Sequence, residues 1–231
     1  MPDPRRLGLA QAVAEEFSWQ ESVGGVRGLL ESVLPVTVFT ALYALTRALT
    51  PCLVGALAVA VVLVLARAVA RQPVMPAVSG LLGVGVGAAV AWGTGNAADY
   101  FLLPLLKNLF FAAVYAGSAL AGWPLVGVVL GVVLKEQTAW REVPERRRVY
   151  AQATWLWAGM FALRFAVELP LYLQQHVVTL GVLSVPLGLP LFGVVLLLTW
   201  LIVRRVPVVE PPEQAGSGGS EGSPEAAEPT A

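Results

Sequence analysis

The chain has 231 residues, of which 57% are hydrophobic and 13% are charged, and its mean hydropathy is +0.72. A soluble domain carries about 25% charged and about 45–50% apolar residues, so this composition excludes an ordinary water-soluble globule. Fifteen basic residues balance fifteen acidic ones, which leaves no basic surplus for a nucleic-acid-binding face. The single cysteine, Cys52, excludes an intrachain disulfide framework.

Residues 1–32 form an N-terminal segment that is more polar than the middle of the chain. Four glutamates are scattered through it, and apolar residues recur at a spacing of three to four from Leu7 to Phe17. This spacing is typical of an amphipathic helix that lies on a membrane surface. We therefore predict a cytoplasmic segment that contains an interfacial helix.

Six apolar stretches come next, each long enough to be considered as a membrane span. About twenty apolar residues in a helix cross a hydrocarbon layer of about 30 Å. Pro51 directly after Thr50 predicts a tight hairpin between the first two stretches, and Gly93–Asn96 separates the third from the fourth. The predicted fold is an all-α integral membrane bundle of six transmembrane helices: Val33–Leu49, Pro51–Ala70, Met75–Trp92, Phe101–Ala121, Tyr150–Leu173 and Val185–Val203.

A seventh apolar stretch, Trp123–Leu134, has only twelve residues. If it does not cross and the N-terminus is inside, most basic residues lie on the cytoplasmic side, as the positive-inside rule requires. A full crossing, the alternative, would move Arg146–Arg148 and Arg204–Arg205 outside. We therefore predict a re-entrant or interfacial half-helix, and twelve cytoplasmic basic residues: Arg5, Arg6, Arg27, Arg67, Arg71, Lys135, Arg141, Arg146, Arg147, Arg148, Arg204 and Arg205.

The last segment, residues 206–231, carries five acids and no base among Gly, Ser, Pro and Ala. Such a composition cannot bury enough apolar surface to fold, which predicts a disordered acidic tail. The predicted organisation is therefore an N-terminal segment, 1–32, a transmembrane domain, 33–205, and the tail. Both termini are expected in the cytoplasm.

The residues that catalysis or metal binding needs are scarce. The chain has one histidine, His176, and one cysteine, whereas a zinc site needs several such ligands. A hydrolase needs a nucleophile, a base and an orienting group within reach of one another, and no such set surrounds His176 in the sequence. We expect a protein that is not an enzyme and that carries no metal or cofactor.

Ionisable residues inside the spans are the most informative feature of the sequence, because each is costly in a bilayer. Helical rise places four of them in the outer half of the bundle, and a fifth ionisable residue, Asp99, lies at its mouth. They form a candidate intramembrane polar network: Arg47, Asp99, Lys107, Arg164 and Glu168.

This network has three interpretations. In the first, Arg47 extends to the outer interface, while Arg164 and Glu168 neutralise each other one helical turn apart and only fix helix packing. In the second, the charges line a pocket for an anionic headgroup or a small solute. In the third, they form a proton or ion pathway.

Small residues at a spacing of four indicate close helix contacts. Gly83 and Gly87 form one GxxxG pair, and Gly127 and Gly131 form another. In lipid such pairs let two helices approach closely. We expect them to serve packing within the chain, with a homodimer seam as the alternative.

Seven runs of the sequence form a recognisable pattern in chain order: Gly24–Pro35, Arg71–Val74, Gly80–Gly83, Thr94–Gly95, Asp99–Leu102, Trp123–Gly127 and Ala153–Arg164. Together they resemble the actinobacterial integral-membrane family catalogued as domain of unknown function 3159. The resemblance covers residues 20–205 and implies a multi-pass plasma-membrane protein of an actinobacterium, with no established activity. Thirteen arginines against two lysines fit a GC-rich genome.

The sequence supports two functional hypotheses. The first is a non-enzymatic, envelope-associated membrane protein that works through packing and through partners: membrane lipids, a second copy or an envelope protein. A weaker similarity in layout to inner-membrane septation proteins keeps envelope maintenance among the roles. The second is a small-solute or anion transporter, or a lipid-binding protein, that uses the candidate polar network. No nucleic-acid partner is expected.

Overall fold

The structure, a computed structural model, describes residues 25–134 and 138–206, with side chains from Val33 onward. Within these ranges the chain is helical and has no strand, so the predicted all-α fold is confirmed. The predicted interfacial helix at Leu7–Phe17, Lys135, and the tail from residue 207 lie outside the described residues. The helices are α3 (Gly25–Thr46), α4 (Leu49–Val69), α5 (Met75–Thr94), η1 (Ala97–Phe101), α6 (Leu102–Leu120), α7 (Leu125–Val133), η2 (Ala139–Arg141), α8 (Pro144–Leu173), α9 (Val177–Leu187) and α10 (Leu189–Val203).

Five helical segments are long and apolar enough to cross a bilayer, by length and composition. A sixth apolar helix, Val33–Thr46, is shorter and is the described part of the first predicted span. Large apolar side chains are exposed along all of these segments, as expected where lipid rather than water is the solvent. The five segments are Leu49–Val69, Met75–Thr94, Ala97–Leu120, Pro144–Leu173 and Val177–Val203.

Two predicted helix boundaries differ from the structure at the first hairpin. The turn lies at Arg47 and Ala48, not at Thr50, and Arg47 has a φ of 52°. Pro51 therefore lies in the first turn of α4, where its missing N–H has no intrahelical acceptor to lose. Arg47 is consequently an exposed residue of the connection and not a member of the first span.

The stretch between the fifth and sixth predicted spans, Gln174–Ser184, is helical over most of its length rather than a connection. Only Gln174–His176 connect α8 to α9, and Gln175 makes the turn with a φ of 60°. Val177 and Leu180 are buried in a shared apolar core, so packing holds this stretch in a helix that begins eight residues before the predicted span at Val185. The chain then breaks at Gly188, between two prolines, before α10.

The described residues cluster into two compact units. The first, which we call unit 1, contains residues 25–106 and 167–190. The second, unit 2, contains residues 107–134, 138–166 and 191–206. Together they cover the predicted transmembrane domain, and α6 and α8 contribute residues to both.

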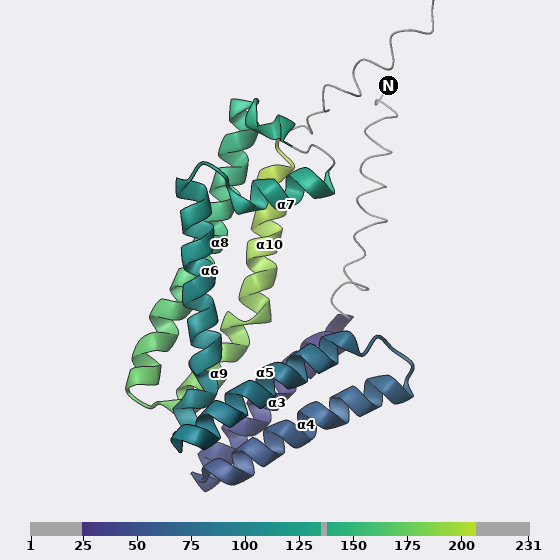
Figure 1. Cartoon of the computed structure of the whole chain (residues 1–231), viewed down its shortest axis with the longest axis vertical. Coiled ribbons are helices and arrows are strands. Elements are labelled where there is room, and N and C mark those ends of the chain that lie inside the picture. Colours follow the sequence, from purple (N-terminus) through teal and green to yellow (C-terminus); the bar gives the residue numbers. More distant parts are fainter. Residues whose placement is uncertain (1–24, 135–137, 207–231) are drawn as a thin grey trace, which may run out of the picture. The chain divides into compact units, whose positions relative to one another are not determined.

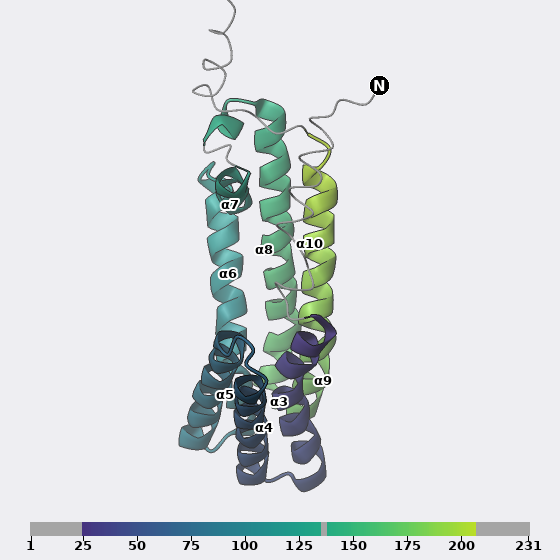
Figure 2. The same cartoon turned by 90° about the vertical axis from the view of Figure 1, so that its right-hand side faces the viewer.

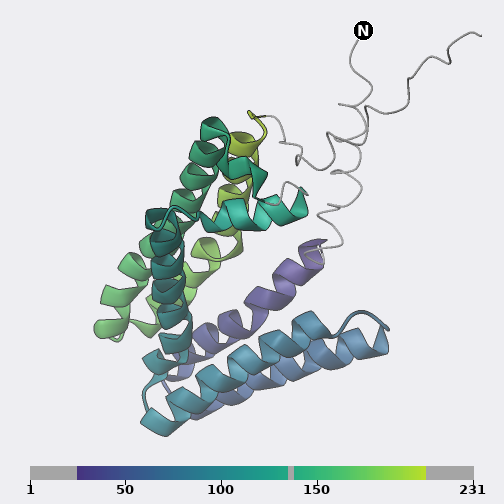
Figure 3. The same cartoon turned by 45° about the horizontal axis from the view of Figure 1, so that its top comes forward.

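Unit 1 is built on the antiparallel pairs α3–α4 and α4–α5, and Figure 3 shows α4 and α5 side by side. Small residues such as Ala56 and Ala88 are buried between these helices, which allows their backbones to approach closely. The ring of Phe39 is stacked on that of Tyr100, with centroids 4.1 Å apart. This stack joins α3 to η1 in the core of the unit.

Helices α3 and α9 of unit 1 approach each other closely at Gly181. A Cβ atom placed on Gly181 would lie 1.8 Å from Oγ1 of Thr40 and 2.7 Å from its Cβ. The Thr40 hydroxyl donates a hydrogen bond to the carbonyl of Val36 (2.7 Å), so its side chain is held in place. Only glycine fits at position 181 in this packing.

Unit 2 contains three long helical segments, from α6, α8 and α10, with the short helix α7 lying across them. Figure 1 shows α7 crosswise to these helices, and Figure 2 shows it almost end-on. α7 has nine residues, which at 1.5 Å each are too few to cross a bilayer. This geometry favours the interfacial form of the predicted half-helix.

Candidate functional site

The five charged residues of the predicted polar network fall in both units. Unit 1 contains Arg47, Asp99 and Glu168, and unit 2 contains Lys107 and Arg164. Each group is therefore described within its own unit, and their convergence into one network stays a prediction.

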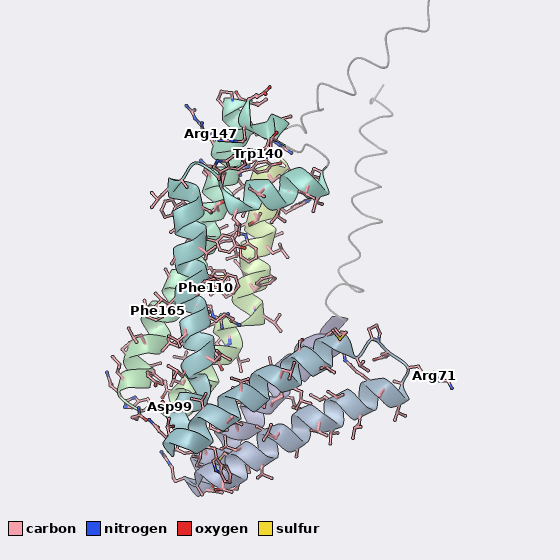
Figure 4. The ribbon with its side chains drawn as sticks, viewed as in Figure 1. Arg71, Asp99, Phe110, Trp140, Arg147 and Phe165 are labelled. Atoms are coloured by element: carbon pink, nitrogen blue, oxygen red, sulfur yellow. The ribbon has the colours of Figure 1, made fainter. Side chains whose placement is uncertain are left out.

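In unit 1, Asp99 lies on η1, and its side chain is buried, with 8% of the residue exposed. The Tyr172 hydroxyl of α8 donates a hydrogen bond of 2.6 Å to Oδ1 of Asp99. The side chain of Asn96 accepts a hydrogen bond from the N–H of Ala98 (3.1 Å) and so caps the start of η1. Figure 4 marks Asp99 at this end of the unit. The carboxylate thus links η1 to the end of α8.

The other two residues of the predicted network that lie in unit 1 differ in environment. The guanidinium of Arg47 lies over the ring of Tyr43 on α3, 5.8 Å from the centroid. Glu168 is buried, with 6% exposed, on α8. Arg47 therefore packs against Tyr43 at a helix end, whereas Glu168 lies in the interior, and the three interpretations of the network stay predictions.

Replacing Tyr172 by phenylalanine is expected to destabilise unit 1, because it leaves the buried Asp99 carboxylate without the phenol donor. The cost of such a lost hydrogen bond is about 1–3 kcal/mol. The measurement is thermal unfolding of the full chain in detergent. The control is Tyr115→Phe, which removes a hydroxyl of unit 2 that is not part of this contact. Equal unfolding temperatures for Tyr172→Phe and wild type would contradict the structural role of this bond.

In unit 2, aromatic contacts set the register of α6 against α8. Phe111 stacks on Phe161 with centroids 5.3 Å apart, and Tyr115 stacks on Trp157 at 5.8 Å. Each step of four residues along α6 thus matches a step of four back along α8. The same antiparallel register, continued by three residues, places Asn108 at the level of Arg164, and continued by four it places Lys107 at the level of Phe165. We call Lys107, Asn108 and Arg164 the unit 2 polar layer.

Sequence reasoning left Asn108 out of the predicted network, although it is 0% exposed. Its position next to Lys107 in an apolar span was the available signal. Trp157 and Thr199 were also missed as a pair, and the indole Nε1 donates a hydrogen bond of 3.0 Å to the Thr199 hydroxyl. This bond joins α8 to α10, and only the three-dimensional arrangement pairs the two side chains.

The four glycines expected to serve helix packing have different surroundings. A Cβ atom on Gly87 would lie 3.0 Å from the carbonyl oxygen of Tyr100, and one on Gly127 would lie 2.9 Å from the Tyr150 ring. Gly131 is buried, whereas a Cβ on Gly83 would have no atom within 4 Å. The close contacts are therefore at Gly87 and Gly127.

The family model described as "Protein of unknown function (DUF3159)" matches residues 23–210. The chain belongs to this family. The similarity noted in its sequence runs is thereby confirmed, and DUF3159 brings no activity with it. Neither a curated protein nor a solved structure matches the chain. Within the described residues of this DUF3159 protein, no three His, Cys, Asp or Glu side chains group as a metal site would need.

Proposed function

We propose that this DUF3159 protein is a non-enzymatic, multi-pass protein of the bacterial plasma membrane that supports the cell envelope through packing and protein partners. Both termini are cytoplasmic in this proposal. The asymmetry of arginine and lysine along the sequence supports this orientation, because basic loops stay on the cytoplasmic side.

The proposal rests on one observation: polar side chains in the interior form hydrogen bonds between helical segments. Tyr172 bonds Asp99 in unit 1, and Trp157 bonds Thr199 in unit 2. The Thr154 hydroxyl of α8 also accepts a hydrogen bond from the N–H of Val126 at the start of α7 (3.3 Å). Hydrogen bonds of this kind between helices act as packing contacts in a membrane protein. They support a structural role for the domain.

The test is deletion of the gene in the bacterium that encodes it, followed by complementation. Entry of a membrane-impermeant dye and sensitivity to lysozyme measure envelope integrity. We expect both to rise on deletion and to return to normal with the wild-type gene. Arg164→Leu is expected to complement equally well, because a scaffold does not need a charge pathway. A deletion strain with an intact envelope would contradict the proposal.

The second candidate is an anion or lipid-binding protein, or a transporter of a small anionic solute. The unit 2 polar layer favours it, because Lys107 and Arg164 bring two positive charges to the level of the buried Asn108. An ionisable residue inside a membrane span is a functional candidate by default. This layer would recognise a phosphate or carboxylate group.

The unit 2 polar layer is tested by native mass spectrometry of the full chain released from nanodiscs. If it binds an anion, retained anionic lipid or solute will be lost in Arg164→Leu and in a variant with Arg47, Lys107 and Arg164 all changed to alanine. An identical mass profile in all three proteins would exclude this candidate. Lower thermal stability of the variants with that unchanged mass profile would leave the charges as packing elements.

A further inference from the structure

The α6–α7 turn of unit 2 is approached by two arginines from a later part of the chain. The guanidinium carbon of Arg141, on η2, lies 3.8 Å from the ring centroid of Trp123. The Nη2 atom of Arg147, on α8, lies 3.3 Å from the position that a Cβ on Gly122 would occupy. Gly122 and Trp123 are adjacent residues, so the two cationic groups come to the same turn. Figure 4 marks Arg147 at this end of unit 2.

Two guanidinium groups at one turn repel each other, and each favours a shared anion over the other cation. A phosphate oxygen set suits them, because a guanidinium presents several N–H donors in a planar fork. The surrounding charge is also positive. Glu142 and Glu145 are exposed nearby, but the same end of unit 2 carries three further exposed arginines: Arg148, Arg204 and Arg205.

The turn also has an apolar side that suits acyl chains. Trp123 is 46% exposed at the point where a membrane-spanning helix ends, which is where tryptophan gathers at the boundary between hydrocarbon and headgroups. α7 begins two residues later and lies crosswise to the long helices of unit 2 (Figure 1). Its exposed face is made of valines: Val128, Val129, Val132 and Val133.

We propose that the α6–α7 turn is a binding site for an anionic phospholipid, with the lipid phosphate between Arg141 and Arg147 and an acyl chain along the valine face of α7. Trp123 positions the Arg141 guanidinium, which lies over its ring in a cation–π contact. The site is separate from the unit 2 polar layer, since Lys107 lies about 20 Å along α6 from its C-terminal end at Leu120.

The test uses the full chain in nanodiscs of phosphatidylglycerol or of phosphatidylcholine, with native mass spectrometry of the released protein. The test variant is Arg141→Gln with Arg147→Gln. The matched control is Arg148→Gln with Arg205→Gln, which removes the same charge from exposed positions at the same end. We expect the wild type to retain phosphatidylglycerol and not phosphatidylcholine. Its retention should fall roughly tenfold in the test variant and stay near wild type in the control.

A second variant keeps the proposal testable if the double substitution fails to fold. Trp123→Leu retains both arginines and removes only the stacking platform, so we expect a smaller but measurable loss of phosphatidylglycerol. Thermal unfolding without added lipid reports on folding for each variant. Equal losses of phosphatidylglycerol in the test and control pairs would show only a general attraction between charges and would overturn the proposal. Full retention of phosphatidylglycerol in both the double variant and Trp123→Leu would also overturn it.

Competition by two soluble ligands tests whether the phosphate that binds at this turn belongs to a phospholipid or to a small molecule. Inorganic phosphate and glycerophosphoglycerol, which lacks acyl chains, are added to the protein in detergent. We expect neither to displace phosphatidylglycerol at millimolar concentration, because the valine face contributes to binding. Displacement by either would overturn the lipid assignment. The outcome is independent of the envelope role, because deletion phenotypes and the Arg164 variant report on that role separately.

Discussion

Replacing Gly181 by alanine is expected to destabilise unit 1 more than other single methyl additions to its helices. The added Cβ would fall 1.8 Å from Oγ1 of Thr40, well inside van der Waals contact. Thr40 cannot rotate away cheaply, since its hydroxyl is bonded to the Val36 carbonyl and it is 6% exposed. Overpacking of this kind costs about 1–3 kcal/mol or more, because α3 and α9 must separate.

The measurement is thermal unfolding of the full chain in detergent, monitored by circular dichroism. Gly85→Ala is the matched control, because a Cβ there meets no atom within 4 Å. That control is expected to be neutral or stabilising by up to about 1 kcal/mol, the gain in helix propensity from glycine to alanine. Adding Thr40→Ala to Gly181→Ala should restore part of the loss, since only the Cβ at position 40 would still clash. A Gly181→Ala protein as stable as wild type would contradict the packing of α3 on α9.

The membrane fold was predictable because hydropathy over about twenty residues is a local property of the chain. The boundaries of the helices were harder to predict. The stretch from Gln174 to Ser184 falls between two predicted spans, yet burial of Leu180 holds most of it in α9. Arg47 falls inside the first predicted span, whereas the structure places it in the turn with a positive φ. Tertiary packing and backbone geometry decided both.

The candidate site was predictable in its residue types but not in its partners. The predicted network includes Asp99 at the mouth of the bundle, but its bond to Tyr172 joins segments far apart in the chain, and no sequence spacing indicates it. Gly181 was missed for the same reason, because the need for glycine arises from Thr40 on another helix. Local sequence patterns predict the helices and the charges that they carry. The order of neighbouring helices, and the rotation of each helix about its axis, are known only from the three-dimensional fold.

Arg146 has a structural role in addition to its charge. The positive-inside argument counts it with Arg147 and Arg148 as one of three equivalent cytoplasmic charges. The structure distinguishes them, since Arg146 is 1% exposed and its neighbours are exposed. Its Nη1 donates hydrogen bonds to the carbonyls of Val203 (3.5 Å) and Val206, and its guanidinium lies 5.0 Å from the Tyr150 ring centroid.

Substituting methionine for Arg146 is therefore expected to loosen the end of α10. Val203 is the last residue of that helix, and the carbonyls of a last turn find no N–H partner within the helix itself, so they need an external donor. Losing a charged donor costs about 1.5–3 kcal/mol per hydrogen bond, and the buried cation contributes through both carbonyls. Arg148→Met removes the same charge from the surface and should cost less than about 0.5 kcal/mol.

Hydrogen exchange of the full chain in nanodiscs separates the two variants at the level of individual segments. Arg146→Met should speed amide exchange in the last turn of α10 and around Tyr150, and lower the unfolding temperature, while Arg148→Met leaves both near wild type. Arg146→Lys should fall between them, because an ammonium keeps the charge but lacks the guanidinium geometry that places Nη1 near both carbonyls. If Arg146→Met and Arg148→Met behaved alike, Arg146 would be an ordinary surface charge. The contrast between these two arginines thus tests whether the end of unit 2 is held by a specific contact or only by its net charge.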